Sequence, residues 1–143
     1  MRISDVLRSK GSDVVSVGPD CTVLEVVRTL IEHNIGATVV VGGGQLVGIL
    51  SERDILRLVA GDPEALADTP TWTVMTRSVV TTHPDANLDE VMHLMTDHKV
   101  RHLPVVARGR LAGIVSIGDV VHNLRSETEA TNRHLMAYIS GKG

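Results

Sequence analysis

Several residue types that support particular functions are scarce or missing in this chain of 143 residues. Its single cysteine, Cys21, excludes an internal disulfide and fits a reducing compartment. The chain has one Trp, one Tyr and no Phe, whereas proteins that bind single-stranded nucleic acids usually stack the bases on aromatic rings. Its net charge of −3 provides no basic surface for a nucleic acid. The composition therefore disfavours a nucleic-acid partner, and any base would have to be held by aliphatic side chains and backbone.

Long apolar segments are also missing. No apolar run approaches the ~20 residues that a membrane-spanning helix needs, and residues 1–10 contain no apolar stretch of signal-peptide length. With 43% hydrophobic and 22% charged residues, the composition is typical of a soluble globular protein. We therefore expect a cytoplasmic protein without a membrane partner, built as one domain or as two small ones.

An internal repeat is the strongest feature that the chain does contain. Residues 14–57 align with residues 79–122 without a gap, and fifteen of the 44 aligned positions are identical. The longest shared phrase is GQLVGILSERD at residues 44–54, which returns as GRLAGIVSIGD at residues 109–119. Chance would produce about two or three identities, so the repeat predicts two halves of similar structure.

Each half has the same predicted order of elements, β-α-β-β-α. A short apolar run leads to Pro-Asp, a turn and helix-start signal, and an amphipathic segment with helical spacing follows. Two β-rich runs joined by a Gly-containing turn predict a hairpin, and Ser-x-x-Asp then opens a second helix. The expected strands are residues 13–17, 36–41 and 46–50 in the first half, and 78–82, 102–106 and 111–115 in the second. Residues 60–73 resemble a connection, and residues 127–139 are expected to form a last helix.

The two Ser-x-x-Asp sequences, residues 51–54 and 116–119, allow two interpretations. A Ser or Asp at a helix start caps the free backbone N–H groups, which is a purely structural role. The same position also presents N–H donors and the positive end of the helix dipole to an anion. A carboxylate there can accept hydrogen bonds from the two hydroxyls of a ribose, as in nucleotide sites of another fold. The residue types therefore fit either a helix cap or a site for a phosphorylated ribonucleoside.

The duplicated phrases, the strand HLPVV at residues 102–106 and the segments before each phrase resemble tandem cystathionine-β-synthase (CBS) domains, of the small stand-alone type. The resemblance covers about residues 1–125 and implies an α/β fold of two β-α-β-β-α units packed with pseudo-twofold symmetry, often as a homodimer. It also implies binding of adenosine-containing ligands. The implied domains are 1–59 for the first CBS domain, 60–73 for the connection, 74–125 for the second CBS domain and 126–143 for a C-terminal helical tail.

The resemblance also implies two binding pockets, each formed by both repeats. One would take Ser51, Arg53 and Asp54, completed by His83, Leu88, Val100, Arg101 and His102. The other would take Ser116 and Asp119, completed by Gly18, Val23, Ile35 and Gly36. Each Asp is expected to hold ribose hydroxyls, each Ser to lie near ribose or phosphate, and the aliphatic residues and strand backbone to enclose adenine.

The two implied pockets differ in charge. Arg53, Arg101 and His102 lie within plausible reach of phosphate groups in the Asp54 pocket, and Arg binds phosphate through charged, often bidentate hydrogen bonds. The Asp119 pocket has neutral residues at the corresponding positions. We therefore predict tighter binding of phosphorylated ligands in the Asp54 pocket.

Other chemistries have weaker support. His93, His98 and His102 lie close in sequence, but the first two are five residues apart, which is poor spacing for one helix face, and no metal-binding motif is present. Cys21 has no partner residues that suggest a reactive thiol. A metal- or redox-responsive module is therefore a third and weaker hypothesis. No pair of nucleophile and base is evident, so we expect no enzyme activity.

Two further features have structural interpretations. The glycines at residues 42–44 lack the Gly-Lys-Ser/Thr ending of a phosphate-binding loop and lead into a strand, so they predict a hairpin turn. The lone Trp72 precedes the second repeat, and we expect it to be buried where the two halves join.

The sequence thus predicts a regulatory module that binds AMP, ADP, ATP, NAD(H) or S-adenosylmethionine and senses energy or redox state. It would require no cofactor, form a homodimer and signal to a separate protein target, because no output domain is recognisable. The alternative is a structural dimerisation module with vestigial pockets.

Overall fold

The computed structural model describes residues 1–139 of the chain. The chain divides into two units. The first-repeat unit comprises residues 13–80 and 108–111, and the second-repeat unit comprises residues 1–12, 81–107 and 112 onward. The N-terminal residues thus belong to the unit of the second repeat, although they precede the first repeat in sequence.

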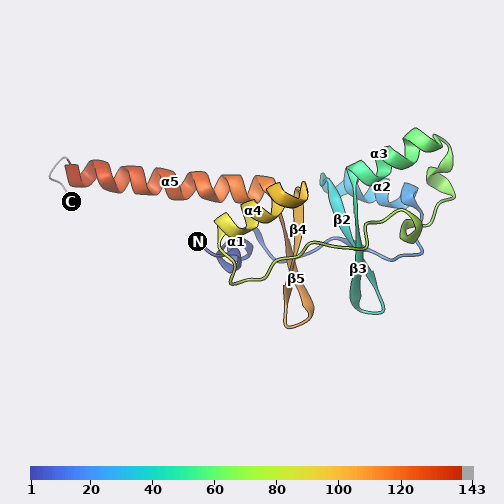
Figure 1. Cartoon of the computed structure of the whole chain (residues 1–143), viewed down its shortest axis with the longest axis horizontal. Helices are drawn as coiled ribbons and strands as arrows, with labels where there is room; N and C mark the ends of the chain where they lie inside the picture. The colour runs from blue at the N-terminus through green and yellow to red at the C-terminus, as the bar shows by residue number, and fades with distance from the viewer. Residues whose placement is uncertain (140–143) are drawn as a thin grey trace. The chain divides into compact units, whose positions relative to one another are not determined.

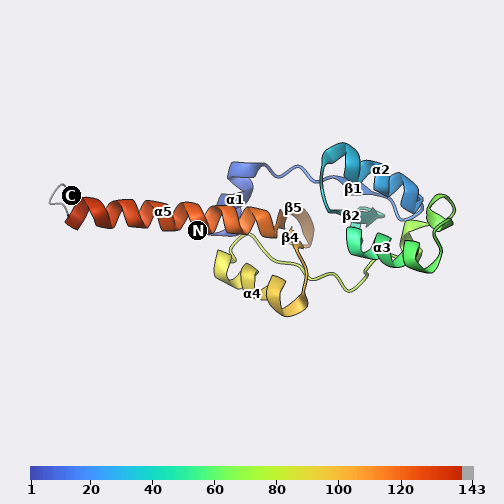
Figure 2. The ribbon, with the colours of Figure 1, turned by 90° about the horizontal axis from the view of Figure 1, so that it is seen from above.

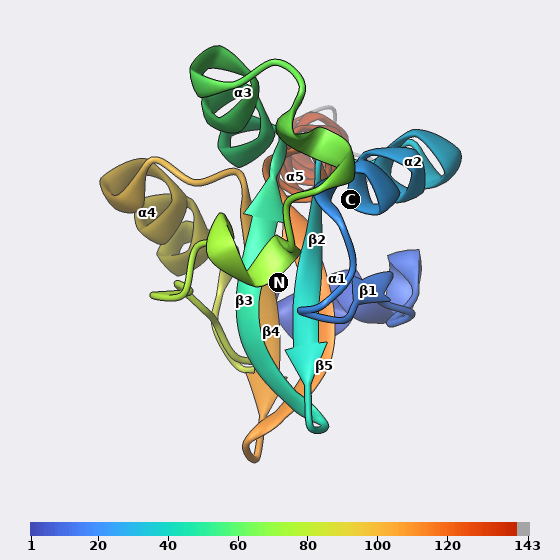
Figure 3. The ribbon, with the colours of Figure 1, turned by 90° about the vertical axis from the view of Figure 1, so that its right-hand side faces the viewer.

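The first-repeat unit contains a three-stranded sheet with the order β1-β2-β3. Strand β1 (Ser16–Val17) is parallel to β2 (Ala37–Gly42), which is antiparallel to β3 (Gln45–Ser51). The turn between β2 and β3 uses Gly43 and Gly44, with φ values of 58° and 75° that favour glycine. This confirms the hairpin predicted from the glycine run. Figure 3 shows the two strands meeting at this turn, with the helices toward their other end.

Two helices pack on this sheet. Helix α2 (Val23–His33) begins at Thr22, whose hydroxyl accepts a hydrogen bond from the Glu25 N–H, and ends at Asn34 in the left-handed conformation. Helix α3 (Glu52–Gly61) follows β3 directly. The apolar face of α2 and the inner face of the strands form the core, whose buried members are Val23, Val26, Leu30, Val40 and Leu50.

The segment after α3 contains two short 3₁₀ helices, η1 (Ala65–Ala67) and η2 (Thr71–Thr73), and then runs beside β3, where Thr76 pairs with Ile49. The expectation that Trp72 is buried is wrong, because Trp72 is 45% exposed. The neighbouring Thr71 is the buried residue of this turn, and its N–H donates to the Cys21 carbonyl. Trp72 instead contacts the Arg77 guanidinium, 6.0 Å from the ring centroid.

The second repeat has the corresponding elements. Helix α4 (Leu88–His98) precedes a hairpin of β4 (His102–Ala107) and β5 (Arg110–Ser116), and helix α5 (Ile117–Ile139) follows. In place of the strand expected at residues 78–82, a single parallel bridge joins Thr82 to Val105. The mixed α/β class and the order of elements agree with the prediction, except for this first strand.

Helix α1 (Ile3–Lys10) is an element that the sequence analysis did not predict. It packs in the second-repeat unit through Ile3 and Val6, both fully buried, and through Leu7. Its first turn is also held by backbone, since the Ile3 N–H donates to the Ala86 carbonyl at 2.9 Å. The leucine side chain of this helix lies against Gly113 of β5, where a larger residue would collide with it.

Helix α5 is one continuous helix of 23 residues. The separate last helix expected at residues 127–139 is therefore its C-terminal half, and residues 140–143 of the expected tail lie outside the described residues. Figures 1 and 2 show α5 continuing well past α1 and α4 of its own unit. Across residues 1–139, no helix combines the length and apolar character that spanning a membrane requires.

Candidate functional site

The first Ser-x-x-Asp sequence lies where β3 passes into α3. Ser51 ends the strand and caps the helix, and its backbone N–H donates to Asp54 Oδ2 at 2.9 Å. The Ser51 hydroxyl donates to the same oxygen at 3.0 Å, and the Asp54 N–H is 3.4 Å from that hydroxyl. The structural interpretation of the motif is therefore confirmed here, because Ser and Asp form a reciprocal capping box.

Asp54 is buried, at 8% exposure, and is held mainly by neutral donors. The Thr76 hydroxyl lies 3.2 Å from Asp54 Oδ1 and 3.5 Å from Oδ2. The Arg57 guanidinium is 4.0 Å from the same oxygen, and its side chain is 72% exposed. Because hydroxyl groups rotate and can exchange partners, these contacts leave the carboxylate able to accept a hydrogen bond from a ligand hydroxyl.

The second Ser-x-x-Asp sequence has the same geometry at the junction of β5 and α5. The Ser116 N–H donates to Asp119 Oδ2 at 2.8 Å, and the Asp119 N–H donates to the Ser116 hydroxyl at 3.2 Å. The Asn123 amide donates to the Asp119 carbonyl at 2.7 Å in the first turn of the helix. The repeated phrase therefore produces the same local structure twice.

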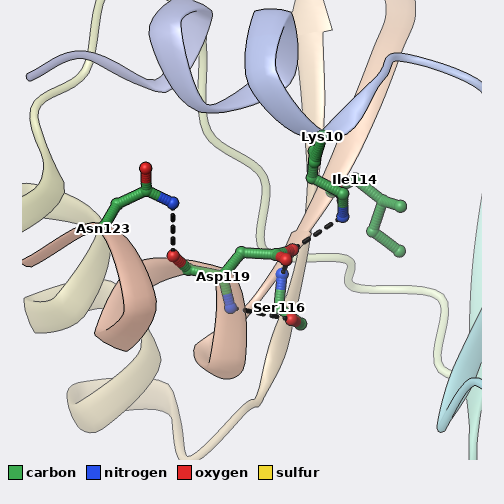
Figure 4. A network of polar contacts seen from close by, with 5 residues as sticks. All are labelled: Lys10, Ile114, Ser116, Asp119 and Asn123. Carbon is green, nitrogen blue, oxygen red and sulfur yellow. Dashed lines mark hydrogen bonds and ion pairs between the residues drawn. The ribbon is translucent and has the colours of Figure 1, made fainter. Parts of the chain in front are cut away.

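A lysine distinguishes the second motif from the first. Lys10, the last residue of α1, donates to Asp119 Oδ2 at 2.6 Å and to the Ile114 carbonyl at 2.9 Å. Figure 4 shows its side chain reaching from α1 to the Asp119 carboxylate beside Ser116. The side chains of Lys10 and Asp119 are 34% and 23% exposed, so the ion pair is partly shielded from solvent.

This environment holds the Asp119 carboxyl in its charged form. Burial acts to raise the pKa of Asp119, but the hydrogen bond and charge of Lys10 and the hydrogen bonds from Ser116 outweigh it. The pKa of Asp119 therefore lies below its ordinary value of 3.8, and the carboxylate is ionised at neutral pH.

The strand starts predicted to line the pockets lie beside the motif of their own repeat. The Gly36 carbonyl accepts from the Glu52 N–H at 3.0 Å, and the Arg101 carbonyl accepts from the Ile117 N–H at 2.8 Å. An antiparallel hairpin causes this, because the start of its first strand pairs with the end of its second. The structure thus brings Gly36 next to Ser51, and Arg101 next to Ser116. The assignment of these strand starts to the opposite pocket stays a prediction.

The other predicted site residues occupy varied positions within their units. Val23 and Leu88 begin α2 and α4 and are 0% and 2% exposed, so their side chains belong to the core. Ile35 also packs against the core of the first-repeat unit. The exposed residues of the set are Gly18, Arg53, His83 and Arg101, whereas Val100 and His102 are partly buried.

Two residues that contact the aspartate carboxylates from outside the motif helices were missed by the sequence analysis, Lys10 and Thr76. Neither belongs to the repeated phrase, and neither occupies a recognisable motif. Lys10 lies in the unpredicted helix α1, and Thr76 lies in the segment that pairs with β3. Only the folded chain brings these two side chains to the aspartates.

In the described part of the chain, a hollow is present but a cluster of metal-binding side chains is not. A shallow hollow of about 320 Å³ runs along α5 and is lined by Val121, Leu124, Arg125, Thr128 and Glu129, not by the Ser-x-x-Asp residues. Within residues 1–139, no three His, Cys, Asp or Glu side chains are grouped so that they could hold a metal ion. The Cys21 thiol lies 3.4 Å from the Thr71 hydroxyl.

Comparison with known proteins gives consistent results. The protein-family model described as CBS domain matches residues 3–61 and 72–126. The mitochondrial CBS domain-containing protein CBSX3 of Arabidopsis thaliana is 37% identical over 97% of this chain and 72% of its own length. The crystal structure of a CBS-domain containing protein from Agrobacterium tumefaciens has a TM-score of 0.84 and 44% identity, covering 86% of this chain and 98% of that one.

A second similar structure contains ligands. The CBS domain pair of protein MJ0100, crystallised in complex with 5′-methylthioadenosine and S-adenosyl-L-methionine, has a TM-score of 0.77 and 26% identity. The match covers 89% of this chain and 98% of that one. With both repeats matched by the domain model and nearly full-length similarity to proteins of this type, the chain belongs to the CBS domain family, as a tandem pair of CBS domains.

Proposed function

We propose that this chain is a regulatory module that binds an adenosine-containing ligand through the carboxylates of Asp54 and Asp119. One observation carries the proposal: the fold positions a carboxylate at the start of a helix twice, by the same Ser-x-x-Asp geometry. The similar MJ0100 domain pair, which binds 5′-methylthioadenosine and S-adenosyl-L-methionine, supports adenosine as the shared part of the ligand.

The physical argument rests on the ribose. Its 2′ and 3′ hydroxyls are two adjacent donors, and an ionised carboxylate is an acceptor with two oxygens. Hydrogen bonds to a charged acceptor are roughly twice as strong as neutral ones, so a ribose gains most from an aspartate that is already oriented. The capping boxes provide this orientation, because each fixes one carboxylate oxygen on the backbone N–H of its serine.

The choice among AMP, ADP, ATP, NAD(H) and S-adenosylmethionine depends on cations near the ribose. Arg53 directly precedes Asp54 and is exposed, which supports a phosphorylated ligand at the first motif. Arg101 lies next to Ile117 in the second-repeat unit, so its contribution to the Asp54 pocket is a separate prediction. We propose a phosphorylated adenosine ligand for the Asp54 pocket on the basis of Arg53.

We further propose that the module regulates a separate cytoplasmic protein target and acts as a homodimer. Ligand binding can change a target only through a difference in affinity between two arrangements of the module. For the dimer, the last turns of α5 carry Leu135, Met136 and Ile139, which are 53%, 68% and 78% exposed. Their spacing places them on one helix face, where a second copy could cover them.

A structural dimerisation module is the second candidate, and one observation favours it. Both motifs are internally satisfied as helix caps, so duplication of a cap would account for their Ser and Asp without any ligand. The two candidates differ in one measurable property, which is whether the aspartates bind adenosine compounds.

Calorimetric titration separates the two candidates. AMP, ATP, NAD, NADH and S-adenosylmethionine are titrated into the wild type, Asp54→Asn and Asp119→Asn. Asn is used because its carbonyl still accepts the serine N–H and maintains the cap. Loss of a charged acceptor should weaken ribose binding by about 1.5–3 kcal/mol, roughly ten- to 150-fold, at the affected site.

The matched control is Glu52→Gln, which removes a negative charge from the exposed first turn of α3 without touching Asp54. It should leave the affinity unchanged. If none of the five compounds binds to folded wild-type protein that is free of copurified ligand, the binding function is wrong and the dimerisation module is the better description.

A further inference from the structure

The Lys10 ammonium donates to a carboxylate oxygen of Asp119 that a ligand hydroxyl would otherwise use as an acceptor. A carboxylate oxygen has two lone pairs. Asp119 Oδ2 accepts one hydrogen bond from the Ser116 N–H at 2.8 Å and another from Lys10 at 2.6 Å. This oxygen is therefore fully used in the folded chain, and a ribose that required both carboxylate oxygens would meet the lysine.

The corresponding aspartate of the first repeat also accepts two hydrogen bonds from Ser51 at its Oδ2, but both of these donors are neutral. Asp54 accepts hydrogen bonds from the backbone and hydroxyl of Ser51 and from the hydroxyl of Thr76. Within residues 1–139, its ion pair is with Arg57 at 4.0 Å, at the limit of such a contact. Neutral hydroxyls can turn toward a ligand, whereas an ammonium group that leaves a carboxylate loses a charged partner.

We propose that Lys10 competes with ligand hydroxyls for the Asp119 carboxylate, so that helix α1 lowers the affinity of the second site and makes the two sites unequal. The proposal rests on the binding function proposed above and concerns the regulation of one of its two sites. The ligand class is an adenosine compound that presents its ribose hydroxyls to Asp119.

Lys10 can release the carboxylate without undocking its helix. The helix is anchored at its other end by the buried side chains of Ile3 and Val6 and by backbone hydrogen bonds from residues 3 and 4. The lysine lies in its last turn, with a side chain 34% exposed, so the ammonium can turn toward water. The Lys10 ammonium can therefore leave the Asp119 carboxylate, or be removed by substitution, while the fold of the unit stays intact.

The test uses adenosine as the probe, because it has the ribose hydroxyls and no charged group that could itself attract Lys10. The wild type is titrated first, and all variants are full-length and carry Asp54→Asn, which leaves Asp119 as the intact site. Lys10→Met removes the charge and keeps an unbranched side chain, and should tighten adenosine binding by about two- to fivefold, the range of an exposed to half-buried ion pair. Lys10→Arg restores a cation and should return the affinity toward that of the Lys10 protein.

The matched control is Arg8→Met on the same helix. Arg8 pairs with Asp5 and is 77% exposed, so this change removes an equal charge without reaching Asp119. It should not alter adenosine affinity, and circular dichroism verifies that every variant is folded. Equal tightening by Arg8→Met would overturn the proposal, because it would show a general effect of charge.

The remaining outcomes distinguish this inference from the proposed function. Unchanged or weaker binding in Lys10→Met overturns the inference alone. If wild type binds adenosine but no protein with Asp54→Asn does, the second site does not bind and the inference is again wrong, while the first site stands. If wild type itself binds no adenosine compound, the proposed function fails and the inference fails with it.

Discussion

Replacing Gly113 with alanine should destabilise the second-repeat unit, because the fold uses this position for a close approach of α1. A Cβ atom at residue 113 would lie 2.7 Å and 2.9 Å from the two Cδ atoms of Leu7. Ordinary contacts between carbon atoms are about 3.5–4.0 Å. Leu7 is only 8% exposed, so its side chain has little space in which to move. We expect Gly113→Ala to lower the free energy of unfolding by about 1–3 kcal/mol, the usual cost of overpacking a core.

A double-mutant cycle with Leu7→Ala tests the stated cause. Removing the leucine side chain creates a cavity and should itself cost about 2–5 kcal/mol, but it also removes the atoms that the new methyl group would meet. In the Leu7→Ala background, Gly113→Ala should therefore cost at least about 1 kcal/mol less than in the wild type. Urea unfolding of the four proteins, followed by circular dichroism, measures the free energies.

Gly118→Ala is the matched control for the added methyl group. At this position the nearest heavy atom to a new Cβ is the Ser116 hydroxyl, at 3.6 Å, which is an ordinary contact. The residue is helical, so alanine should be neutral or stabilise the protein by up to about 1 kcal/mol. Additive effects of Gly113→Ala and Leu7→Ala, within about 0.5 kcal/mol, would refute the close approach as the cause.

Two further predictions concern the ion pair and the end of α5. Because the folded pKa of Asp119 lies below 3.8, the stability that Lys10 contributes is complete above that value and is lost as the pH falls through the folded pKa. The wild type should therefore exceed Lys10→Met by about 0.5–1 kcal/mol in free energy of unfolding by urea at pH 7. The difference should shrink as the pH falls below 3.8, and a difference independent of pH would contradict this. The double variant Leu135→Asp with Ile139→Asp should convert the proposed dimer to a monomer in sedimentation experiments. The control His134→Asp, on the opposite helix face, should leave the dimer unchanged. An unchanged mass in the double variant would exclude the face of Leu135 and Ile139 as the interface.

The sequence by itself determined the repeat, the order of elements and the caps. These features depend on residues close together in the chain: helical spacing in α2 and α4, the glycine turn between β2 and β3, and a serine three residues before an aspartate. Prediction failed at two elements. The strand expected at residues 78–82 is reduced to one bridge at Thr82, and helix α1 was not expected.

The tertiary structure alone decided what surrounds each aspartate. Lys10 is 109 residues from Asp119 and Thr76 is 22 residues from Asp54, and no periodic pattern links either pair. The two motifs are alike in sequence, yet one carboxylate is held by neutral hydroxyls and the other by a lysine. This difference arises because α1 packs on the second-repeat unit through apolar side chains, and that packing brings its last residue to Asp119. Local sequence specifies how a motif folds. The charged group that contacts its aspartate depends on which distant segment the hydrophobic core packs beside the motif.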